Sequence, residues 1–381
     1  MEAYFDNAAT TKVFPEVKDL VVKLMEENYG NPSSLHQKGL DAGHYIKETK
    51  EILAKEWKVD SKEIVLTSGG TESNNLALIG TALANKRSGN RIITTKVEHA
   101  SVSSTMAFLE SLGFEIIYLN VDHHGIVDLG QLEQEVNEDT ILVSVMYVNN
   151  EIGTVEPIQE IAEIIKEKNP KTLFHVDAIQ AFGKYHIYPK RMGIDLMSVS
   201  GHKIHGPKGT GALFIKNRTK VKPIIYGGGQ QGGMRSGTEN VPGFAGFGLA
   251  TKMVYEDLEA RTVRMRAVKD RLTERLKTLP DVYINEGEAP HILSVSFVGV
   301  RSEVMLHALE EREIYVSSGS ACSSNKPAVS HVLASIGLPK DRLESTIRFS
   351  FSAENTVEQA DYAADVIEEI LPVYRKYVRK K

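Results

Sequence analysis

Short apolar runs rich in valine and isoleucine recur through the first two thirds of the chain. Each run is too short for a typical helix, and β-branched residues favour strands. We therefore predict seven strands, at residues 63–67, 91–95, 115–119, 141–147, 172–176, 194–199 and 211–215. Most of the runs are separated by segments with helical periodicity. Such an alternation predicts an α/β fold with a mostly parallel seven-stranded sheet that helices cover on both faces.

Helical periodicity is clearest in three segments. The segment that opens at Pro157 repeats isoleucine at the i, i+3, i+4 spacing of a buried helix face. A helix from about Pro15 carries one apolar stripe, and we expect Gly30 to end it. The pattern also predicts a long helical stretch over residues 245–279.

The pattern changes towards the C-terminus, where strands at about 282–285, 292–297 and 346–351 mix with helices. Such a mixture of short strands and helices is typical of a smaller α+β domain. A chain of 381 residues is long enough for two or three domains. We expect a large α/β domain at 16–255 and a small α+β domain made of 1–15 and 256–381.

Composition narrows the class of protein. The chain has 45 Lys and Arg against 50 Asp and Glu, and without a basic block this balance argues against nucleic acid as the main ligand. A single cysteine excludes an internal disulfide framework and a cysteine-rich metal site, so no metal is expected. The start has no signal-peptide pattern, and the apolar runs are far shorter than the ~20 residues that span a bilayer. We expect a cytoplasmic protein without membrane contact.

The most informative stretch is Ser200-Gly201-His202-Lys203, which directly follows a predicted strand. Its polar residues should lie at the carboxyl end of the sheet, where open α/β sheets bind ligands. No Gly-Lys-Ser/Thr follows a spaced glycine, so this is not a Walker A loop. A lone lysine on a turn is usually solvated. Lys203 is therefore a candidate functional residue only because of the residues near it.

Lys203 follows the predicted strand at 194–199, and Asp177 stands at the end of the strand before it, at 172–176. An aspartate after an apolar run is often only a turn former or a helix cap. Here the two residues end successive strands, so both can face one crevice. Pyridoxal phosphate requires such a pair, because it takes a lysine for its Schiff base and an acid against its pyridinium nitrogen.

Two further strand ends carry polar residues. Thr67-Ser68-Gly69-Gly70-Thr71-Glu72 runs from a strand into a helix, which places free N–H groups where a phosphate could bind. Small residues also cap ordinary helices, so this signal is weak alone. His99 follows another strand and could stack on a planar ring or move protons, although a lone histidine is more often structural.

Taken together and in order, these motifs resemble those of the cysteine desulfurases, in the class V aminotransferase group of fold-type I pyridoxal phosphate enzymes. The resemblance covers nearly the whole chain. The matching stretches are residues 5–11 (FDNAATT), 29–34 (YGNPSS), 67–74 (TSGGTESN), 149–153 (NNEIG), 175–180 (HVDAIQ), 200–203 (SGHK), 235–240 (RSGTEN), 318–322 (SGSAC) and 347–350 (IRFS). The glycines alone are unspecific, but the ordered set is a strong signal.

The resemblance implies a role for each matching residue. Lys203 would hold the cofactor, with Asp177 at the pyridine nitrogen, Gln180 at the ring oxygen and His99 over the ring face. Gly70, Thr71, Ser200 and His202 would hold the phosphate, and Thr238 would reach the phosphate of the neighbouring subunit, which implies a homodimer. Asn31, Asn150 and Arg348 would bind the substrate, the arginine as a bidentate fork for its carboxylate.

Cys322, the only cysteine, lies in a run of serine, glycine and alanine. A lone cysteine is commonly a small buried hydrophobe, but this polar setting favours an exposed loop. The resemblance implies that Lys203 takes the Cα proton of L-cysteine and that the Cys322 thiolate attacks the substrate sulfur. Alanine and a persulfide result. The spacing from Cys322 to the apolar stretch at His331 resembles that of the long-loop subgroup of this family. Members of this subgroup pass sulfur to an acceptor protein, such as an iron–sulfur scaffold or a tRNA-thiolation enzyme.

Three alternatives remain open at this point. The same fold could run selenocysteine cleavage or transamination, although transamination has little use for a cysteine on such a loop. The chain could also be a binding or scaffold protein that has lost its chemistry. The presence of Lys203, Asp177, Cys322 and Arg348 argues against that interpretation.

Overall fold

The computed structural model describes residues 1–318 and 330–376, and within them the first two thirds of the chain form a seven-stranded sheet. Its strands are β2 (Ile64–Thr67), β3 (Arg91–Thr95), β4 (Glu115–Leu119), β5 (Thr140–Met146), β6 (Leu173–Asp177), β7 (Leu196–Ser200) and β8 (Gly211–Ile215). Each lies within two residues of a predicted strand. The strand order is β2-β8-β7-β6-β5-β3-β4, and the pairings are parallel except those of β8.

β8 is antiparallel to both of its neighbours because the chain returns quickly after β7. Only residues 201–210 connect the two strands. A parallel pair needs a crossover of about a dozen residues or more, so this connection permits only a hairpin-like return. The short loop carries Lys203 at the carboxyl end of β7.

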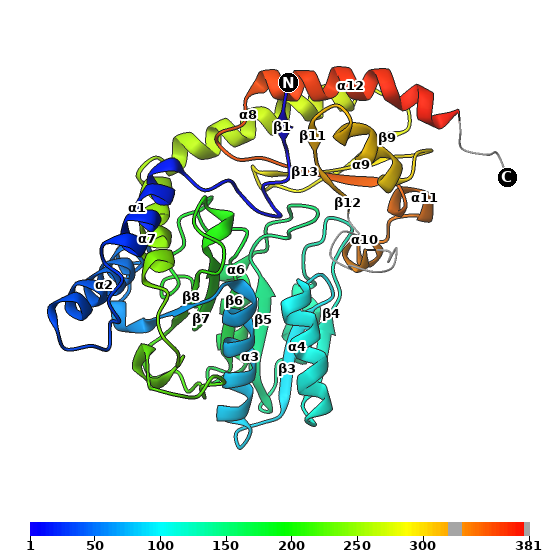
Figure 1. Ribbon diagram of the computed structural model, residues 1–381. Coiled ribbons are helices and arrows are strands. Elements are labelled where there is room, and N and C mark those ends of the chain that lie inside the picture. Colours follow the sequence, from blue (N-terminus) through cyan, green and yellow to red (C-terminus); the bar gives the residue numbers. More distant parts are fainter. Residues whose placement is uncertain (319–329, 377–381) are drawn as a thin grey trace.

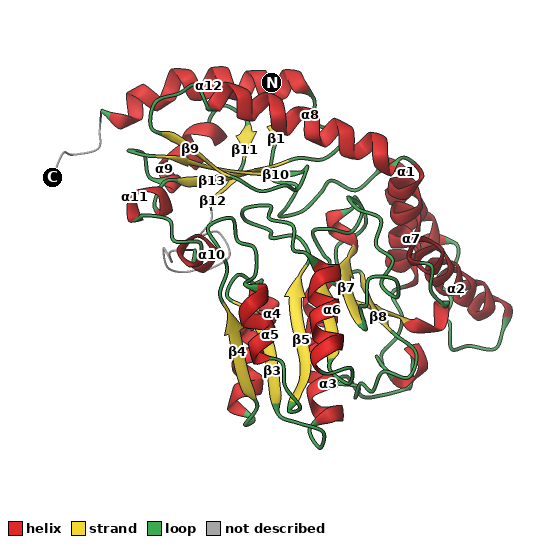
Figure 2. Cartoon of the chain, turned by 180° about the vertical axis from the view of Figure 1, so that it is seen from behind, coloured by secondary structure: helices red, strands yellow, loops and turns green. Residues whose placement is uncertain are grey.

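Helices cover both faces of the sheet (Figures 1 and 2). One face packs against α3 (Gly70–Asn85) and α4 (Ala100–Ser111), and the other against α5 (Leu129–Glu135), α6 (Ile158–Lys168) and α7 (Val241–Glu256). Two more helices, α1 (Pro15–Glu26) and α2 (Gln37–Trp57), lie against α7. The predicted two-sided coverage of a mostly parallel sheet is confirmed. None of the helices in the described ranges is both long and apolar enough to cross a membrane.

Two helix predictions need correction. The helix from Pro15 ends at Glu26 rather than at Gly30. A Cβ on Gly30 would lie 2.1 Å from the Lys38 carbonyl oxygen, so this glycine permits the close approach of α2 rather than ending α1. The stretch 245–279 is two helices, α7 and α8 (Leu258–Leu276), because the backbone leaves the helical region at Asp257 and the two helices join different cores.

The C-terminal part has a second, antiparallel sheet in the order β12-β13-β10-β9. Its strands are β9 (Val282–Asn285), β10 (Ile292–Phe297), β12 (Ser317–Ser318) and β13 (Thr346–Ser350). A separate strand pair joins β1 (Ala3–Tyr4) to β11 (Ile314–Tyr315). The helices of this part are α8, α9 (Ser302–Glu310), α10 (His331–Ser335), α11 (Lys340–Leu343) and α12 (Val357–Arg375).

The N-terminal segment connects the two parts. Ala3 and Phe5 are buried in the core of the second sheet, whereas Ala8 and Phe14 belong to the core of the large sheet. The chain thus passes from one part to the other between residues 5 and 8, and this stretch lies next to the loop that carries Lys203. The predicted domain bounds at 15/16 and 255/256 stay a prediction.

Candidate active site

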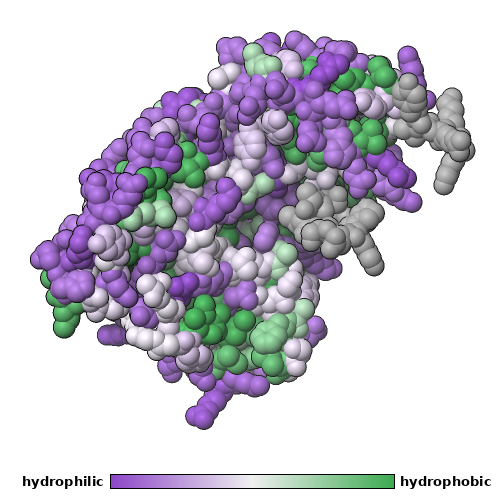
Figure 3. Space-filling model, in the orientation of Figure 1, coloured by the Kyte–Doolittle hydropathy of each residue, from purple (hydrophilic) through white to green (hydrophobic). Residues whose placement is uncertain are grey.

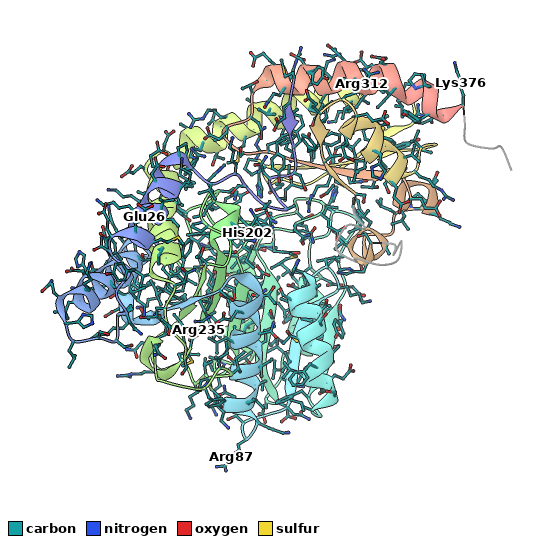
Figure 4. All side chains as sticks on the ribbon, viewed as in Figure 1. Glu26, Arg87, His202, Arg235, Arg312 and Lys376 are labelled. Carbon is teal, nitrogen blue, oxygen red and sulfur yellow. The ribbon has the colours of Figure 1, made fainter. Side chains whose placement is uncertain are left out.

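A cavity of about 480 Å³ lies where the carboxyl ends of the large sheet face the second sheet. This volume is typical of a pocket for a small molecule. The polar residues that line it come from both parts of the chain: Asp6, Thr71, His99, Ser101, Asn150, Glu151, Asp177, Gln180, Ser200, His202, Lys203, Ser294, Ser317, Ser318, Thr346 and Arg348. Figure 4 labels His202 among them, between the large sheet and the upper part of the molecule.

Lys203 ends the short 3-10 turn Gly201–Lys203 that follows β7. Its Nζ donates hydrogen bonds to the backbone carbonyl oxygens of Ala8 and Ala9, the latter at 2.7 Å. Its own carbonyl oxygen accepts a hydrogen bond from Lys184 Nζ at 2.7 Å. The amine of Lys203 is therefore held at the cavity wall, against the segment that links the two parts.

Asp177 is the last residue of β6 and is 4% exposed. Its Oδ1 accepts a hydrogen bond from the Ile179 N–H at 3.0 Å, and its Oδ2 accepts one from Asn74 Nδ2 at 2.8 Å. Burial raises the pKa of this carboxyl, and the neighbouring His99 and Lys203 oppose the rise. A buried carboxylate fixed in this way can pair with a cationic ring nitrogen.

His99 caps the N-terminus of α4, so its position follows from the strand-to-helix turn after β3. The Ser101 N–H donates to His99 Nδ1 at 3.1 Å, which leaves Nε2 to carry the proton of the neutral ring. Burial lowers the pKa of His99, against the pull of Asp177. The lowered pKa favours the uncharged form of the ring, which lines the cavity.

The turn from β2 into α3 forms an anion corner. Gly70 and Thr71 open the helix, and the first N–H groups of a helix have no acceptor within it. The other sides of the corner are Ser200 and His202, which line the same cavity. Burial and the nearby Lys203 lower the pKa of His202 to about 4, so it offers a neutral ring. Backbone and side-chain donors of this kind suit a phosphate.

Gln180 also lines the cavity, but both ends of its amide already contact protein groups. Its Nε2 donates to the Ala8 carbonyl oxygen at 3.0 Å, and its Oε1 lies 3.3 Å from His291 Nε2. A contact from Gln180 to a bound ring would therefore use the second N–H of the amide.

Arg348 enters the cavity from β13 and is 8% exposed. Its Nη1 donates to the carbonyl oxygen of Asn150 at 2.8 Å, and its Nη2 donates to Asp6 Oδ1 at 2.9 Å. Its Nε is buried without a hydrogen-bond partner among the described residues. A guanidinium that lines a cavity is suited to receive a carboxylate.

Two of the predicted site residues, Asn31 and Thr238, lie outside this cavity. Asn31 lies on an exposed segment, where its Oδ1 accepts a hydrogen bond from the Ser33 N–H at 2.9 Å, and it is absent from the cavity lining. Thr238 is also exposed and does not line the cavity. Cys322 lies outside the described residues.

Asn74, to which no role was assigned from the sequence, connects two site residues. Its Nδ2 donates to Asp177 Oδ2 at 2.8 Å and to Ser101 Oγ at 2.9 Å, and Ser101 in turn contacts His99. The available signal was its spacing, because Asn74 follows Gly70 by one helical turn and so shares its face of α3. Asp6 and Glu151, which also line the cavity, were likewise given no role.

Comparisons with known proteins agree with this geometry. The family model described as aminotransferase class-V matches residues 3–362. The chain is 41% identical to a cysteine desulfurase IscS of Clostridium botulinum strain Hall, over 100% of this chain and 98% of that protein. It is 42% identical to the cysteine desulfurase IscS of Dictyoglomus turgidum, over 98% of this chain and 95% of that protein.

Solved structures show the same similarity. A NifS-like protein superposes with a TM-score of 0.93 at 38% identity, over 98% of this chain and all of that chain. A NifS-like protein from Rickettsia africae superposes with a TM-score of 0.88 at 32% identity, with the same coverage of both chains.

Proposed function

The chain belongs to the aminotransferase class-V family, and from this premise we propose that it is a cysteine desulfurase. It converts L-cysteine to L-alanine and transfers the sulfur to the thiol of Cys322. The observation that carries the proposal is the meeting of Lys203, the buried Asp177 and Arg348 in one cavity. The relatives named cysteine desulfurase, which match over almost their full length, decide between the activities that this fold supports.

The residues present fit pyridoxal phosphate, on which enzymes of this family depend. Lys203 would hold it covalently and Asp177 would pair with its ring nitrogen. The phosphate would occupy the anion corner made by Gly70, Thr71, Ser200 and His202, while His99 and Gln180 would flank the ring. When bound, the cofactor supplies an electron sink for the charge that develops at the substrate Cα.

The chain's own groups supply binding and proton transfer. Arg348 orients the α-carboxylate of cysteine, with Asn150 holding the guanidinium in place. The amine of Lys203 moves the proton at the substrate Cα, and the neutral ring of His99 is placed to move a second proton. The Cys322 thiolate then attacks the substrate sulfur. The Cβ–S bond breaks, an S–S bond forms, and Cys322 becomes a persulfide.

Residues on both sides of Cys322 support its part in this reaction. Ser317 and Ser318, which precede it, line the cavity, and so does Leu333, which follows it. Ser330 Oγ donates a hydrogen bond to Glu151, another residue of the lining. The described residues on either side of the segment 319–329, which contains Cys322, therefore line one cavity.

We also propose that the enzyme is a homodimer. The segment that joins α1 to α2 exposes Tyr29 and Leu35, and the adjoining ends of the two helices expose Met25 and Leu40. Figure 3 shows hydrophobic residues at this lower left edge of the molecule. Exposed apolar clusters mark interaction sites. Thr238 is exposed as well, as a residue that reaches a neighbouring subunit must be.

The persulfide passes its sulfur to an acceptor protein, such as an iron–sulfur scaffold or a tRNA-thiolation enzyme. A reactive thiol without a second cysteine in the chain suits a reducing compartment, so we place the activity in the cytoplasm.

The test is to supply L-cysteine and a reductant and to quantify alanine and sulfide. Wild type should yield equal amounts, and both Cys322→Ala and Lys203→Ala should abolish the yield. Lys208→Ala, an exposed lysine in the same loop, is the matched control and should keep full activity. Full turnover in Cys322→Ala would instead indicate a lyase or an aminotransferase. A wild type without alanine would direct the test to selenocysteine and then to amino-group transfer.

A further inference from the structure

Asp6 is a charged residue of the cavity that the reaction as proposed does not use. It follows β1, and its side chain is 20% exposed. Its Oδ1 accepts hydrogen bonds from Arg348 Nη2 at 2.9 Å and from Ser317 Oγ at 2.7 Å. All three residues line the cavity. A carboxylate of the protein thus already contacts the guanidinium that would receive the carboxylate of the substrate.

The charge balance at Arg348 depends on this contact. The other strong acceptor of its guanidinium is the carbonyl oxygen of Asn150, which carries no net charge. Within the described part of the chain, Arg348 forms one ion pair, and Asp6 is its partner. A partly buried pair of this kind is incompletely screened by water. The positive charge of Arg348 is therefore already balanced by Asp6, and the negative charge of Asp6 also repels an incoming carboxylate.

Glu151 is the other acid close to this point, and it differs from Asp6. Burial raises the pKa of the Glu151 carboxyl, which Arg348 opposes, and Ser330 Oγ donates a hydrogen bond to it. Asp6 is more open to water and pairs directly with the cation. Asp6 is therefore the acid that pairs directly with the Arg348 guanidinium.

We propose that Asp6 is a specificity-determining residue, which weakens carboxylate binding at Arg348 and restricts the site to amino acids with one carboxylate. The proposal rests on the proposed function, in which Arg348 binds the α-carboxylate. Alanine carries the same α-carboxylate and amine as cysteine, so an uncompensated Arg348 would retain the product as firmly as the substrate. Aspartate and glutamate would bring a further negative charge into a cavity that already contains Asp6, and would be repelled.

The test is Asp6→Asn, which removes the charge but keeps an oxygen that can accept both hydrogen bonds. We expect the KM for L-cysteine and the inhibition constant of L-alanine to fall by about fivefold, the upper end for a single charge interaction that water still partly screens. The inhibition constant of cysteamine, which has no carboxylate, should not change. L-aspartate, which should not perturb the absorbance of the wild-type cofactor, should do so in the variant.

Ser317→Ala is the matched control, because it removes a neutral hydrogen bond and leaves the charge of Asp6 in place. It should not change the ratio of cysteine to cysteamine affinity. Asp6→Ser repeats the test if Asp6→Asn does not fold. An unchanged or raised KM for cysteine, or an equal shift for cysteamine, would overturn the proposal.

Titrations of alanine and cysteamine against the absorbance of the bound cofactor need no turnover. If the wild type makes no alanine from cysteine, the proposed function fails, while these titrations still decide the role of Asp6.

Discussion

Gly70 shows how closely the anion corner is packed. It begins α3, and a Cβ at this position would lie 2.1 Å from the Cδ1 atom of Ile179, on the turn after Asp177. A side chain there must displace the end of Ile179, and with it the segment that donates a hydrogen bond to Asp177. The glycine therefore serves the packing between the two turns that line the cavity, as well as the N-terminus of the helix.

We predict that Gly70→Ala weakens pyridoxal phosphate binding by about tenfold, the usual scale for overpacking a tight contact by one methyl group. Adding Ile179→Val removes the Cδ1 atom and should restore part of the affinity. The measurement is titration of the cofactor-free protein, followed by absorbance. Ile179→Val alone is the control and should bind nearly as wild type does. Equal affinity of Gly70→Ala and wild type would contradict the packing argument.

Site residues differ in how far the sequence could predict their place. Asp177, Lys203 and Gly70 stand directly at strand ends, so the alternation of strands and helices was enough to bring them to one edge of the sheet. Asn74 and Asp6 act through contacts with residues far away in the sequence, and no local pattern encodes such a contact. Asn31 was carried over from the resemblance alone, and one chain does not bring it to the cavity.

At the level of elements, His175 connects the three central strands of the large sheet. It lies on β6 with no exposed surface, its Nδ1 is 2.9 Å from Ser144 Oγ on β5, and its Nε2 is 3.0 Å from Ser198 Oγ on β7. The apolar pattern predicted this strand correctly. The polar bridge depends on strand order and register, which the pattern does not contain.

Burial lowers the pKa of His175 to about 3, whereas in the unfolded chain it is about 6.5. Between these values the unfolded state binds the extra proton, so the free energy of unfolding decreases as the pH falls below about 6.5. His175 should contribute a loss of about 2 kcal/mol between pH 7 and pH 5. Urea unfolding at both pH values should therefore show a smaller loss for His175→Gln than for wild type.

His44→Gln is the matched control for this prediction, because His44 is exposed. It should lose as much stability at pH 5 as the wild type does. An equal loss in wild type and His175→Gln would mean that His175 takes up its proton without unfolding of the sheet.

The differences between the predicted and the observed helices and strands have local physical causes. The seven strands were predicted within two residues because their apolar runs are short and sharply bounded. The antiparallel course of β8 follows from the length of the connection after β7, and the break at Asp257 separates helices that belong to different cores. Periodicity alone reports neither the direction of a strand nor the core that a helix joins.

At the scale of the whole molecule, the cavity is built from distant parts of the chain. Asp6 and Arg348 lie 342 positions apart, and the backbone of residues 8 and 9 accepts the hydrogen bonds of Lys203. The ordered motifs predicted that these segments belong to one site through the resemblance to a family. Physical reasoning on the sequence alone reached only the large sheet, because the path of residues 5–8 between the two cores leaves no periodic signal.

The homodimer is the prediction that concerns the molecule as a whole. Leu35 is 94% exposed and lies with Tyr29 on the segment between α1 and α2, next to the exposed Met25 of α1 and Leu40 of α2. If this segment is covered by a second copy, Leu35→Asp places a charge in the interface and should shift the protein towards monomers. Sedimentation at micromolar concentration measures this shift. Turnover per chain should fall by about tenfold or more, because Thr238 would no longer reach the phosphate of a neighbouring subunit.

Val263→Asp is the control for this prediction, since Val263 on α8 is 67% exposed and lies far along the chain from the α1–α2 segment. It should remain a dimer with full turnover. A monomeric wild type would contradict the homodimer itself, whereas a dimeric Leu35→Asp would place the interface elsewhere. A monomeric Leu35→Asp with full turnover would show that one chain completes the active site, and the role of Thr238 would then be wrong.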